Sequence, residues 1–156
     1  MCGPSGSGKT TWVKNQMADM TYPAAHISRD EIRFSMLKED EDYFAHEDAV
    51  VKEFYRKAQE AIDGEPLAIF IDATHLSEKA RNATLDNLNL ENCELFAVSF
   101  NVPVDICLTQ NEGRTGRAKV PRSVIRRMYY SYEAPKETGE KYSYTILNVG
   151  VKEEED

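Results

Sequence analysis

The chain has 156 residues, of which 41% are hydrophobic and 29% charged, and its formal net charge is -8 at pH 7. This length suits one domain with its own core, and the composition is that of a globular protein. The acidic balance argues against a protein that coats nucleic acid through bulk electrostatics, and no apolar run approaches the length of a membrane span.

The first residues carry neither the charged nor the apolar region of a signal peptide, so we expect a cytoplasmic protein. The cysteines Cys2, Cys93 and Cys107 have no paired spacing and predict reduced thiols rather than disulfides or a zinc site. No linker or repeat interrupts the sequence. We therefore expect a single domain over residues 1–156, with an acidic tail from about residue 150.

The opening stretch MCGPSGSGKTTW contains the pattern G-x-x-x-x-G-K-S/T, whose glycines let backbone N–H groups close around phosphates at the start of a helix. Lys9 is expected to reach the β- and γ-phosphates of ATP, Thr10 to hold Mg²⁺, and Thr11 to contact the α-phosphate. The alternative is a glycine-rich turn that binds no ligand. The amphipathic helix predicted directly after the loop argues against this alternative. The predicted nucleotide-binding residues are Gly3, Ser5, Gly6, Ser7, Gly8, Lys9, Thr10 and Thr11.

A phosphate loop normally follows a β-strand, but only Met1 and Cys2 precede it here. A parallel sheet is expected to lead into such a loop from a central apolar strand. Either the natural start lies several residues upstream, which we favour, or the sheet lacks this strand. A missing strand would lower the stability of this form of the chain, and loss of activity is one expected consequence.

Helices and strands alternate after the loop. Capping residues Ser28 and Glu31 begin the second helix, and Gly64 with Pro66 ends the third. This alternation predicts an α/β fold of the P-loop NTPase type, with a parallel sheet flanked by helices on both faces and the loop at its carboxyl edge. The predicted helices cover 9–20, 28–37, about 44–63, 77–88, a segment from Pro103, and 121–133, and the predicted strands are AAHIS, LAIFIDA, LFAVSF and YTILNV.

In the segment SRDEIR, Asp30 and Arg33 lie three residues apart in the first turn of a helix, so both side chains leave it on one face. An acid there can take the proton of an acceptor hydroxyl while the arginine holds an anionic group of that acceptor. Acids are also common in a first turn because they complement the helix dipole. The spacing alone leaves both interpretations open, and it assigns no role to the acidic run KEDEDYF that follows.

Asp72 ends the apolar strand LAIFIDA, where phosphate-loop proteins place an acid near the metal. A capping or turn aspartate is the alternative at this position. The histidines His26, His46 and His75 have no partner at ligand spacing and are predicted to be structural.

Basic residues outnumber acids between residues 105 and 136, in contrast to the rest of the chain. In this stretch Arg114 and Arg117 belong to a glycine-containing loop, which predicts a lid whose arginines close over a transferring phosphate. An exposed basic loop is the open alternative. The next helix adds arginines that would line the approach of a nucleic acid strand or form a solvated face, namely Arg122, Arg126 and Arg127.

The chain resembles the kinase domain of the polynucleotide 5′-hydroxyl kinase family in segments that follow one another over nearly its whole length. These are GPSGSGKTTW, SRDEIRFSM, IFIDATHLSEKAR, FNVPVDICL and GRTGRAKVPRSVIRRMY. The resemblance implies that Asp30 is the general base and that Arg33 holds the acceptor's phosphate. It also implies that Asp72 supports the site and that Arg114, or Arg117, contacts the donor phosphates.

The resemblance further implies an enzyme that uses ATP and Mg²⁺ to phosphorylate the 5′-hydroxyl ends of DNA or RNA, with Lys9 and Arg114 neutralising charge on the γ-phosphoryl group. His75 and Gln110 stand where the family often has asparagine and arginine, and no phosphatase or ligase signature is present. Two rival functions remain open. One is a kinase of a sugar, nucleoside or antibiotic, which the acidic net charge favours; the other is an ATPase or nucleotide-binding module without an acceptor.

Overall fold

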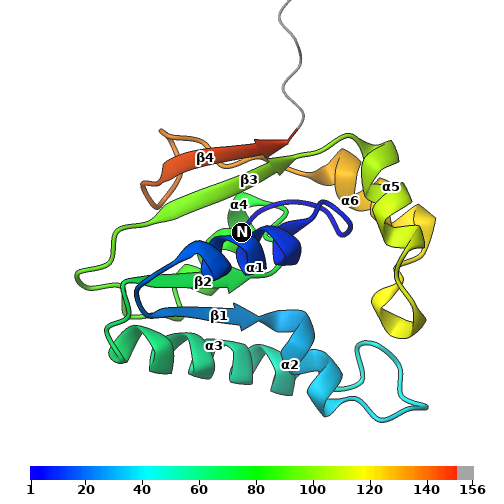
Figure 1. Ribbon diagram of the computed structural model, residues 1–156, viewed down its shortest axis with the longest axis horizontal. Coiled ribbons are helices and arrows are strands. Elements are labelled where there is room, and N and C mark those ends of the chain that lie inside the picture. The colour runs from blue at the N-terminus through cyan, green and yellow to red at the C-terminus, as the bar shows by residue number, and fades with distance from the viewer. Residues whose placement is uncertain (151–156) are drawn as a thin grey trace, which may run out of the picture. The chain divides into compact units, whose positions relative to one another are not determined.

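The computed structural model describes residues 1–150, in which helices alternate with parallel strands (Figure 1). The predicted acidic tail lies outside the described residues, apart from its first position. The elements are α1 (Lys9–Asp19), β1 (Ala24–Ser28), α2 (Arg29–Met36), α3 (Glu47–Asp63), β2 (Ala68–Asp72), α4 (Glu78–Leu85), β3 (Phe96–Asn101), α5 (Val104–Glu112), a 3-10 turn (Gly116–Ala118), α6 (Arg122–Ser131) and β4 (Thr145–Gly150).

The chain divides into two compact units. Unit 1 contains Met1–Lys9, Thr74–Asn82 and the chain from Cys93 onward, and unit 2 contains Thr10–Ala73 and Ala83–Asn92. Because unit 2 is inserted between segments of unit 1, neither unit is one contiguous stretch. The single domain over residues 1–156 stays a prediction.

In unit 2, β1 and β2 pair in parallel and carry helices on both faces. Successive strand residues point to opposite faces. On one face Ile27 and Ile71 pack against a core that includes Phe54 of α3. On the other face the ring of Phe70 meets Trp12 of α1 edge-on, with ring centroids 6.1 Å apart. Figure 1 shows α3 running beside this sheet, so the prediction of helices on both faces holds for this strand pair.

In unit 1, β3 and β4 pair in parallel, and Cys2 forms an isolated parallel bridge with Ser99 of β3. The backbone N–H of Cys2 donates to Val98 O at 2.8 Å, and Phe100 N–H donates to Cys2 O at 2.9 Å. Cys2 therefore occupies the position expected for a strand that leads into the phosphate loop, with a single bridge in place of a full strand. The upstream start stays a prediction.

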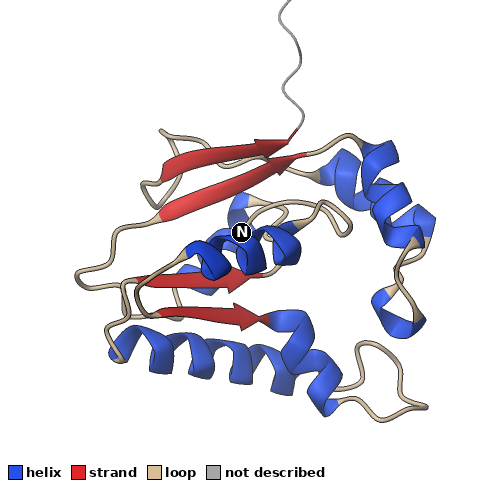
Figure 2. Cartoon of the chain, viewed as in Figure 1, coloured by secondary structure: helices blue, strands red, loops and turns tan. Residues whose placement is uncertain are grey.

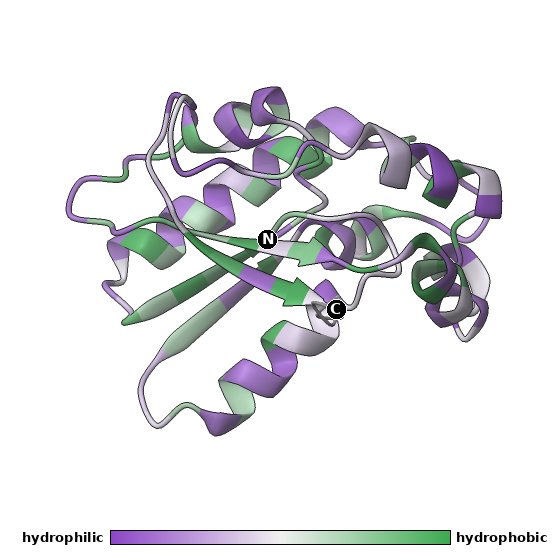
Figure 3. Cartoon of the chain, turned by 90° about the horizontal axis from the view of Figure 1, so that it is seen from above, coloured by the Kyte–Doolittle hydropathy of each residue, from purple (hydrophilic) through white to green (hydrophobic). Residues whose placement is uncertain are grey.

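The predicted α/β class with parallel strands is confirmed, and the strands form two separate pairs (Figure 2). In Figure 3 the hydrophobic colour lies mainly on the strands, whereas the helices alternate between hydrophobic and hydrophilic residues. This pattern is typical of strands covered by amphipathic helices. Among residues 1–150, no helix combines the length and apolar character that a bilayer span requires.

Two predicted helix boundaries are wrong by three residues, because the helix expected to reach residue 88 ends at Leu85 and the third helix starts late. The helix expected from about Phe44 begins at Glu47 instead. The Oδ1 atom of Asp42 accepts a hydrogen bond from Phe44 N–H at 2.9 Å, and Asp42 O accepts one from Ala45 N–H at 3.0 Å. Such aspartate turns compete with helix formation, so the chain turns before the helix starts.

Candidate functional site

The phosphate loop in unit 1 has a backbone that only glycine accommodates. Gly6 adopts a φ of +82°, and a Cβ atom at this position would lie 2.3 Å from the carbonyl oxygen of Cys107. Gly8 has a φ of +89° directly before α1 begins at Lys9. The loop thus leads into a helix N-terminus, where backbone N–H groups are available to an anion.

Lys9 is buried across this loop. Its Nζ atom donates hydrogen bonds to Gly3 O at 2.8 Å and to Pro4 O at 2.7 Å. The hydroxyl of Ser7 also donates to Pro4 O, at 2.8 Å. The ammonium group is therefore held by the phosphate loop itself, next to the backbone that the sequence predicts to bind phosphates. Ser5 belongs to the same loop.

Thr10, in unit 2, lies against the acid that was predicted to stand near the metal. Its hydroxyl donates to Asp72 Oδ2 at 2.8 Å, and His26 Nε2 lies 2.9 Å from the same oxygen. His26 and Asp72 share a face because Asp72 pairs with Ser28, two residues beyond His26, in the parallel register. Thr11, the next residue of α1, is exposed.

Thr10 and Asp72 fit a magnesium site of the kind found in phosphate-binding enzymes. Both offer hard oxygen ligands, and Mg²⁺ in such enzymes usually has one or two protein ligands, with phosphates and water completing its shell. No group of three or more His, Cys, Asp or Glu side chains in residues 1–150 forms a cage for a metal ion. The protein's contribution would therefore be the hydroxyl of Thr10 and the neighbouring carboxylate.

The second half of the predicted site lies at the start of α2. Arg33 Nη1 donates to Asp30 Oδ1 at 2.7 Å, which confirms that the two side chains leave one helix face. Arg33 Nη2 donates to Glu47 Oε2 of α3 at 2.6 Å, and Arg29 binds the other oxygen of Glu47. The Arg33 side chain is only 5% exposed, whereas that of Asp30 is 59% exposed. The guanidinium is thus fixed, and the carboxylate of Asp30 remains open to solvent.

Electrostatics stabilise this cluster in its charged form. Burial is the largest single effect on Arg33 and lowers its pKa, but the hydrogen bond that Arg33 donates to Glu47 and the electrostatic interactions with Tyr43, Glu47 and Asp30 together outweigh it, so the net pKa is raised. Burial likewise tends to raise the pKa of Glu47, and the hydrogen bonds of Arg33 and Arg29 reverse this, so its pKa is lowered. Arg33 and Glu47 are therefore both ionised at neutral pH.

Tyr43 completes the cluster from the acidic segment (residues 38–46) between α2 and α3. Its hydroxyl donates to Asp30 Oδ1 at 2.7 Å and accepts from Arg33 Nη1 at 2.9 Å. Its ring lies against the guanidinium of Arg33, 4.3 Å from centroid to Cζ. Burial and the charge of Asp30 raise the pKa of Tyr43, so the hydroxyl keeps its proton. Sequence reasoning missed Tyr43 and Glu47, which carry no local motif.

The predicted arginine loop lies in unit 1 between α5 and α6. Fully buried Asn111 closes it, because Asn111 Nδ2 donates to Val120 O at 2.7 Å and Asn111 Oδ1 accepts from Val120 N–H at 2.9 Å. Arg114 makes a long contact of 3.5 Å with Ala118 O, and Arg117 lies in the 3-10 turn. The loop's ends are therefore fixed, while the role of either arginine stays a prediction. Asn111 has no sequence signal.

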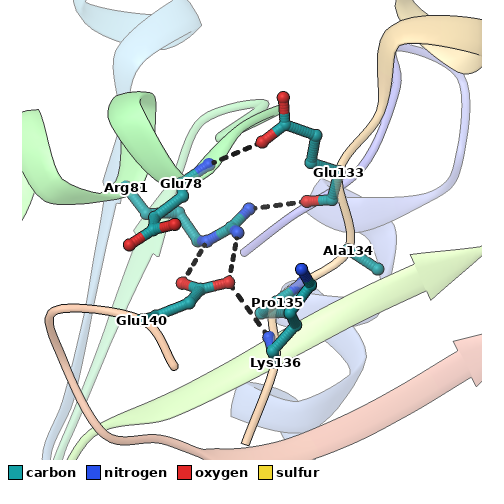
Figure 4. A pocket seen from close by; sticks show the side chains of 7 residues that line it. All are labelled: Glu78, Arg81, Glu133, Ala134, Pro135, Lys136 and Glu140. Carbon is teal, nitrogen blue, oxygen red and sulfur yellow. Dashed lines mark hydrogen bonds and ion pairs between the residues drawn. The ribbon is translucent and has the colours of Figure 1, made fainter. Parts of the chain in front are cut away.

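A pocket of about 410 Å³ lies elsewhere in unit 1 (Figure 4). Arg81 Nη2 donates to Glu140 Oε1 at 2.6 Å and Arg81 Nη1 donates to Glu133 O at 2.8 Å. Both members of the Arg81–Glu140 ion pair are buried, and their charges satisfy each other. The pair therefore anchors the loop that follows α6. The lining residues are Glu78, Arg81, Glu133, Ala134, Pro135, Lys136 and Glu140.

The predicted site residues fall into both units. Unit 1 holds the phosphate loop up to Lys9 together with Arg114 and Arg117, and unit 2 holds Thr10, Thr11, Asp30, Arg33 and Asp72. Within the units, the structure brings Lys9 to the loop, Thr10 to Asp72, and Asp30 to Arg33.

Comparison with known proteins identifies both a family and a fold. The profile of the family described as "AAA domain" matches residues 1–135. A search of curated protein sequences finds no match. A chain of the Pnkp1/Rnl/Hen1 RNA repair complex is similar with a TM-score of 0.70 and 19% identity, over 83% of this chain and 42% of that chain. This chain thus spans less than half the length of that relative.

Two further solved structures are kinases of small molecules. A sugar kinase from a Janibacter species has a TM-score of 0.58 and 18% identity, over 94% of this chain and 82% of its own. Deoxyadenosine kinase from M. mycoides with bound dATP has a TM-score of 0.50 and 16% identity, over 96% of this chain and 88% of the kinase chain. At these identities the likeness concerns the fold alone, which is that of the P-loop kinases, as the sequence predicts.

Proposed function

The chain belongs to the AAA domain family, and we propose that it is a kinase that transfers the γ-phosphate of ATP to the 5′-hydroxyl of DNA or RNA. Its phosphate loop and its fold are those of a kinase-like ATP-binding domain. The observation that carries the proposal is the Asp30–Arg33 pair, in which an exposed carboxylate lies 2.7 Å from a fixed guanidinium. This pair suits an acceptor that has a hydroxyl and a phosphate close together.

On the donor side, the phosphate loop binds ATP through its backbone N–H groups and Lys9. The ammonium of Lys9 exchanges carbonyl partners for oxygens of the β- and γ-phosphates, a charge-assisted and therefore stronger interaction. Thr10 holds Mg²⁺ with Asp72 beside it, and the ion when bound supplies positive charge to the phosphates. Arg114 or Arg117 neutralises further charge on the transferring group.

On the acceptor side, Asp30 removes the proton of the 5′-hydroxyl while Arg33 holds the adjacent phosphate. Asp30 is accessible, as a general base must be. Arg33 is held by Glu47, so an acceptor bound to it is presented in one orientation. Phosphoryl transfer depends mainly on such positioning and on charge stabilisation, both of which these residues provide.

A second candidate function is phosphorylation of a small molecule. The sugar kinase and the deoxyadenosine kinase match this chain over 82% and 88% of their own lengths, compared with 42% for the RNA repair chain. The net charge of -8 also suits a small acceptor better than a polyanion.

The experiment that separates these functions follows label from γ-labelled ATP, with Mg²⁺, to an oligonucleotide bearing a 5′-hydroxyl. The same oligonucleotide with a 5′-phosphate runs beside it. We expect label on the hydroxyl end only, lost in Asp30→Ala and in Arg33→Ala. Glu31→Ala is the matched control, because Glu31 is an exposed acid in the same helical turn.

Each contrary outcome points to one rival. A folded protein that labels a sugar or nucleoside but no oligonucleotide is a small-molecule kinase. ATP hydrolysis that persists unchanged in Asp30→Ala, without transfer to any acceptor, indicates an ATPase. Equal loss in Glu31→Ala and Asp30→Ala would show that the two acids act on the helix rather than on the acceptor.

A further inference from the structure

His26 in β1 contacts the acid at the end of β2. Its Nε2 atom lies 2.9 Å from Oδ2 of Asp72, and the side chains of this pair are only 11% and 5% exposed. The parallel register places the two residues on the same face of the strand pair. A buried carboxylate of the proposed magnesium site therefore has an imidazole as its direct neighbour.

The chemistry of the two groups identifies which of them donates. The carboxylate of a metal site is ionised and can only accept hydrogen bonds, so the Nε2 atom of His26 carries the hydrogen in this contact. The same oxygen of Asp72 also accepts the hydroxyl hydrogen of Thr10, at 2.8 Å. Asp72 consequently receives one hydrogen bond from β1 and one from α1, and these two elements hold its carboxylate.

These bonds orient the hydroxyl of Thr10. A hydroxyl has one hydrogen and two lone pairs. Because Thr10 gives its hydrogen to Asp72, the lone pairs of its oxygen are left for a cation. Without the hydrogen bond from His26, the carboxylate of Asp72 is free to turn, and the hydroxyl of Thr10 loses its fixed direction. His26 thus acts on Thr10 through Asp72.

Packing keeps the imidazole in this arrangement. His26 pairs with Phe70 in the register of β1 and β2, so its side chain lies on the face where Phe70 meets Trp12 of α1. A side chain that is already confined on folding loses little further conformational freedom when it forms its hydrogen bond. The contact with Asp72 is therefore preorganised before any nucleotide binds.

We propose that His26 is a positioning residue of the magnesium site, which orients Asp72 and Thr10 and so strengthens the binding of ATP together with Mg²⁺. Residues that hold metal ligands in place in this way change metal affinity by about 10–100-fold when they are replaced. The inference rests on the proposed kinase function and concerns the donor side of that same site. The acceptor has no part in it.

The test measures the affinity of a fluorescent, non-hydrolysable ATP analogue in Mg²⁺ and in EDTA. His26→Leu removes the hydrogen-bond donor, whereas His26→Gln supplies an amide N–H with about the reach of Nε2. In His26→Leu we expect the affinity in Mg²⁺ to fall about tenfold. The affinity in EDTA should not change, because it depends on the phosphate loop and Lys9. His26→Gln should recover most of the loss, which a role in packing alone does not predict.

His46→Leu is the matched control, because His46 Nε2 lies 2.8 Å from Glu41 Oε2 in the acidic segment of the same unit. This variant should bind the analogue as wild type does under both conditions. Thermal unfolding followed by circular dichroism identifies the folded variants. His26→Ala, which also lacks the donor, replaces His26→Leu if the latter is unfolded.

The outcomes separate this inference from the function on which it rests. An equal loss of affinity in Mg²⁺ and in EDTA, or no loss in either, overturns the role of His26 and leaves the kinase proposal in place. Wild type that binds the analogue equally well with and without Mg²⁺ also overturns it. The expected affinities without phosphate transfer to any acceptor support the role of His26 and overturn the kinase function alone.

Discussion

Arg33 and Arg81 are buried arginines that occur in different units and have different surroundings. Arg33 binds Asp30, which is 59% exposed, and Glu47, so part of its cluster faces solvent. Arg81 binds Glu140, and the side chains of this pair are 4% and 2% exposed. The first cluster is partly open to solvent, as the proposed acceptor site requires. The second has its charges satisfied by the protein and is a structural anchor.

Arg81→Met is expected to destabilise the protein, because it leaves the Glu140 carboxylate buried without a counter-ion. Loss of one partner of a buried ion pair costs about 3–5 kcal/mol in the free energy of unfolding. Urea unfolding measures this change. The double variant Arg81→Met with Glu140→Leu should recover part of the loss, since neither charge remains. A double variant less stable than Arg81→Met would contradict this account of the pair.

At the scale of elements, two connections hold helices in register with their neighbours. Asn111 in α5 is bonded twice to Val120 and so closes the loop that carries Arg114. Glu47 in α3 is bonded to two arginines of α2 and so joins those helices. In both cases one polar side chain near a helix end fixes a neighbouring segment, the following loop for Asn111 and the preceding helix for Glu47.

Asn111→Ala should loosen the arginine loop. The change removes two hydrogen bonds and leaves the partly buried backbone N–H of Val120 without its partner, at an expected cost of about 1–3 kcal/mol. Limited trypsin digestion, followed by mass spectrometry, should show faster cleavage after Arg114 and Arg117. Thr109→Ala, an exposed change in the same helix, is the control. Identical digestion of Asn111→Ala and wild type would exclude the role of Asn111 in closing the loop.

Glu47 gives the protein a predictable response to acid. The pKa of Glu47 is lowered in the folded state. The contribution of Glu47 to stability is therefore fully present above its unfolded pKa of about 4.5. This contribution is lost as the pH falls below that value and through the folded pKa. Glu47→Gln should therefore be less stable than wild type at pH 7, with a difference that shrinks toward pH 3. Unfolding midpoints across this range measure it, and a constant difference would refute the assignment.

Most elements and several site pairs could be predicted because their causes are local. Ser28 accepts a hydrogen bond from Glu31 N–H, as the capping pattern implies, and Asp30 meets Arg33 one turn later. The contact of Thr10 with Asp72 follows from the general placement of such an acid at a strand end. The bond of His26 to Asp72 depends on strand register, which no periodicity encodes, and Tyr43 reaches Asp30 through turns whose direction the sequence does not specify.

At the scale of the whole molecule, the charge distribution matters more than its sum. The net charge is -8, yet the stretch from residue 105 to residue 136 is basic and lies within unit 1. In this stretch Arg126 and Arg127 are exposed on α6, where a polyanion has access to them. An acidic protein with one basic stretch has an electrostatic preference for where a nucleic acid strand binds.

Salt dependence tests whether α6 contacts the acceptor strand. The plot of log affinity for a 5′-hydroxyl oligonucleotide against log salt concentration should be shallower for the double variant Arg126→Ala and Arg127→Ala. We expect its slope to fall in magnitude by about 1.4, because each phosphate contact to a single strand contributes about 0.7 to the slope. Binding measured by fluorescence anisotropy gives the slope. Glu137→Ala serves as a control for a nearby exposed charge. An unchanged slope would show that these arginines form a solvated face.

The division into two units also has a consequence for how the chain folds. Nearly all of unit 2 is the continuous stretch Thr10–Ala73, whereas unit 1 joins the first nine residues to strands beyond residue 93. Contacts between distant segments form slowly, and during synthesis they must wait for the later segments to emerge. Gly6 reaches its packed position only against Cys107. We therefore expect the phosphate loop, although it precedes all the helices and strands of the structure in the sequence, to be among the last parts to acquire its native shape.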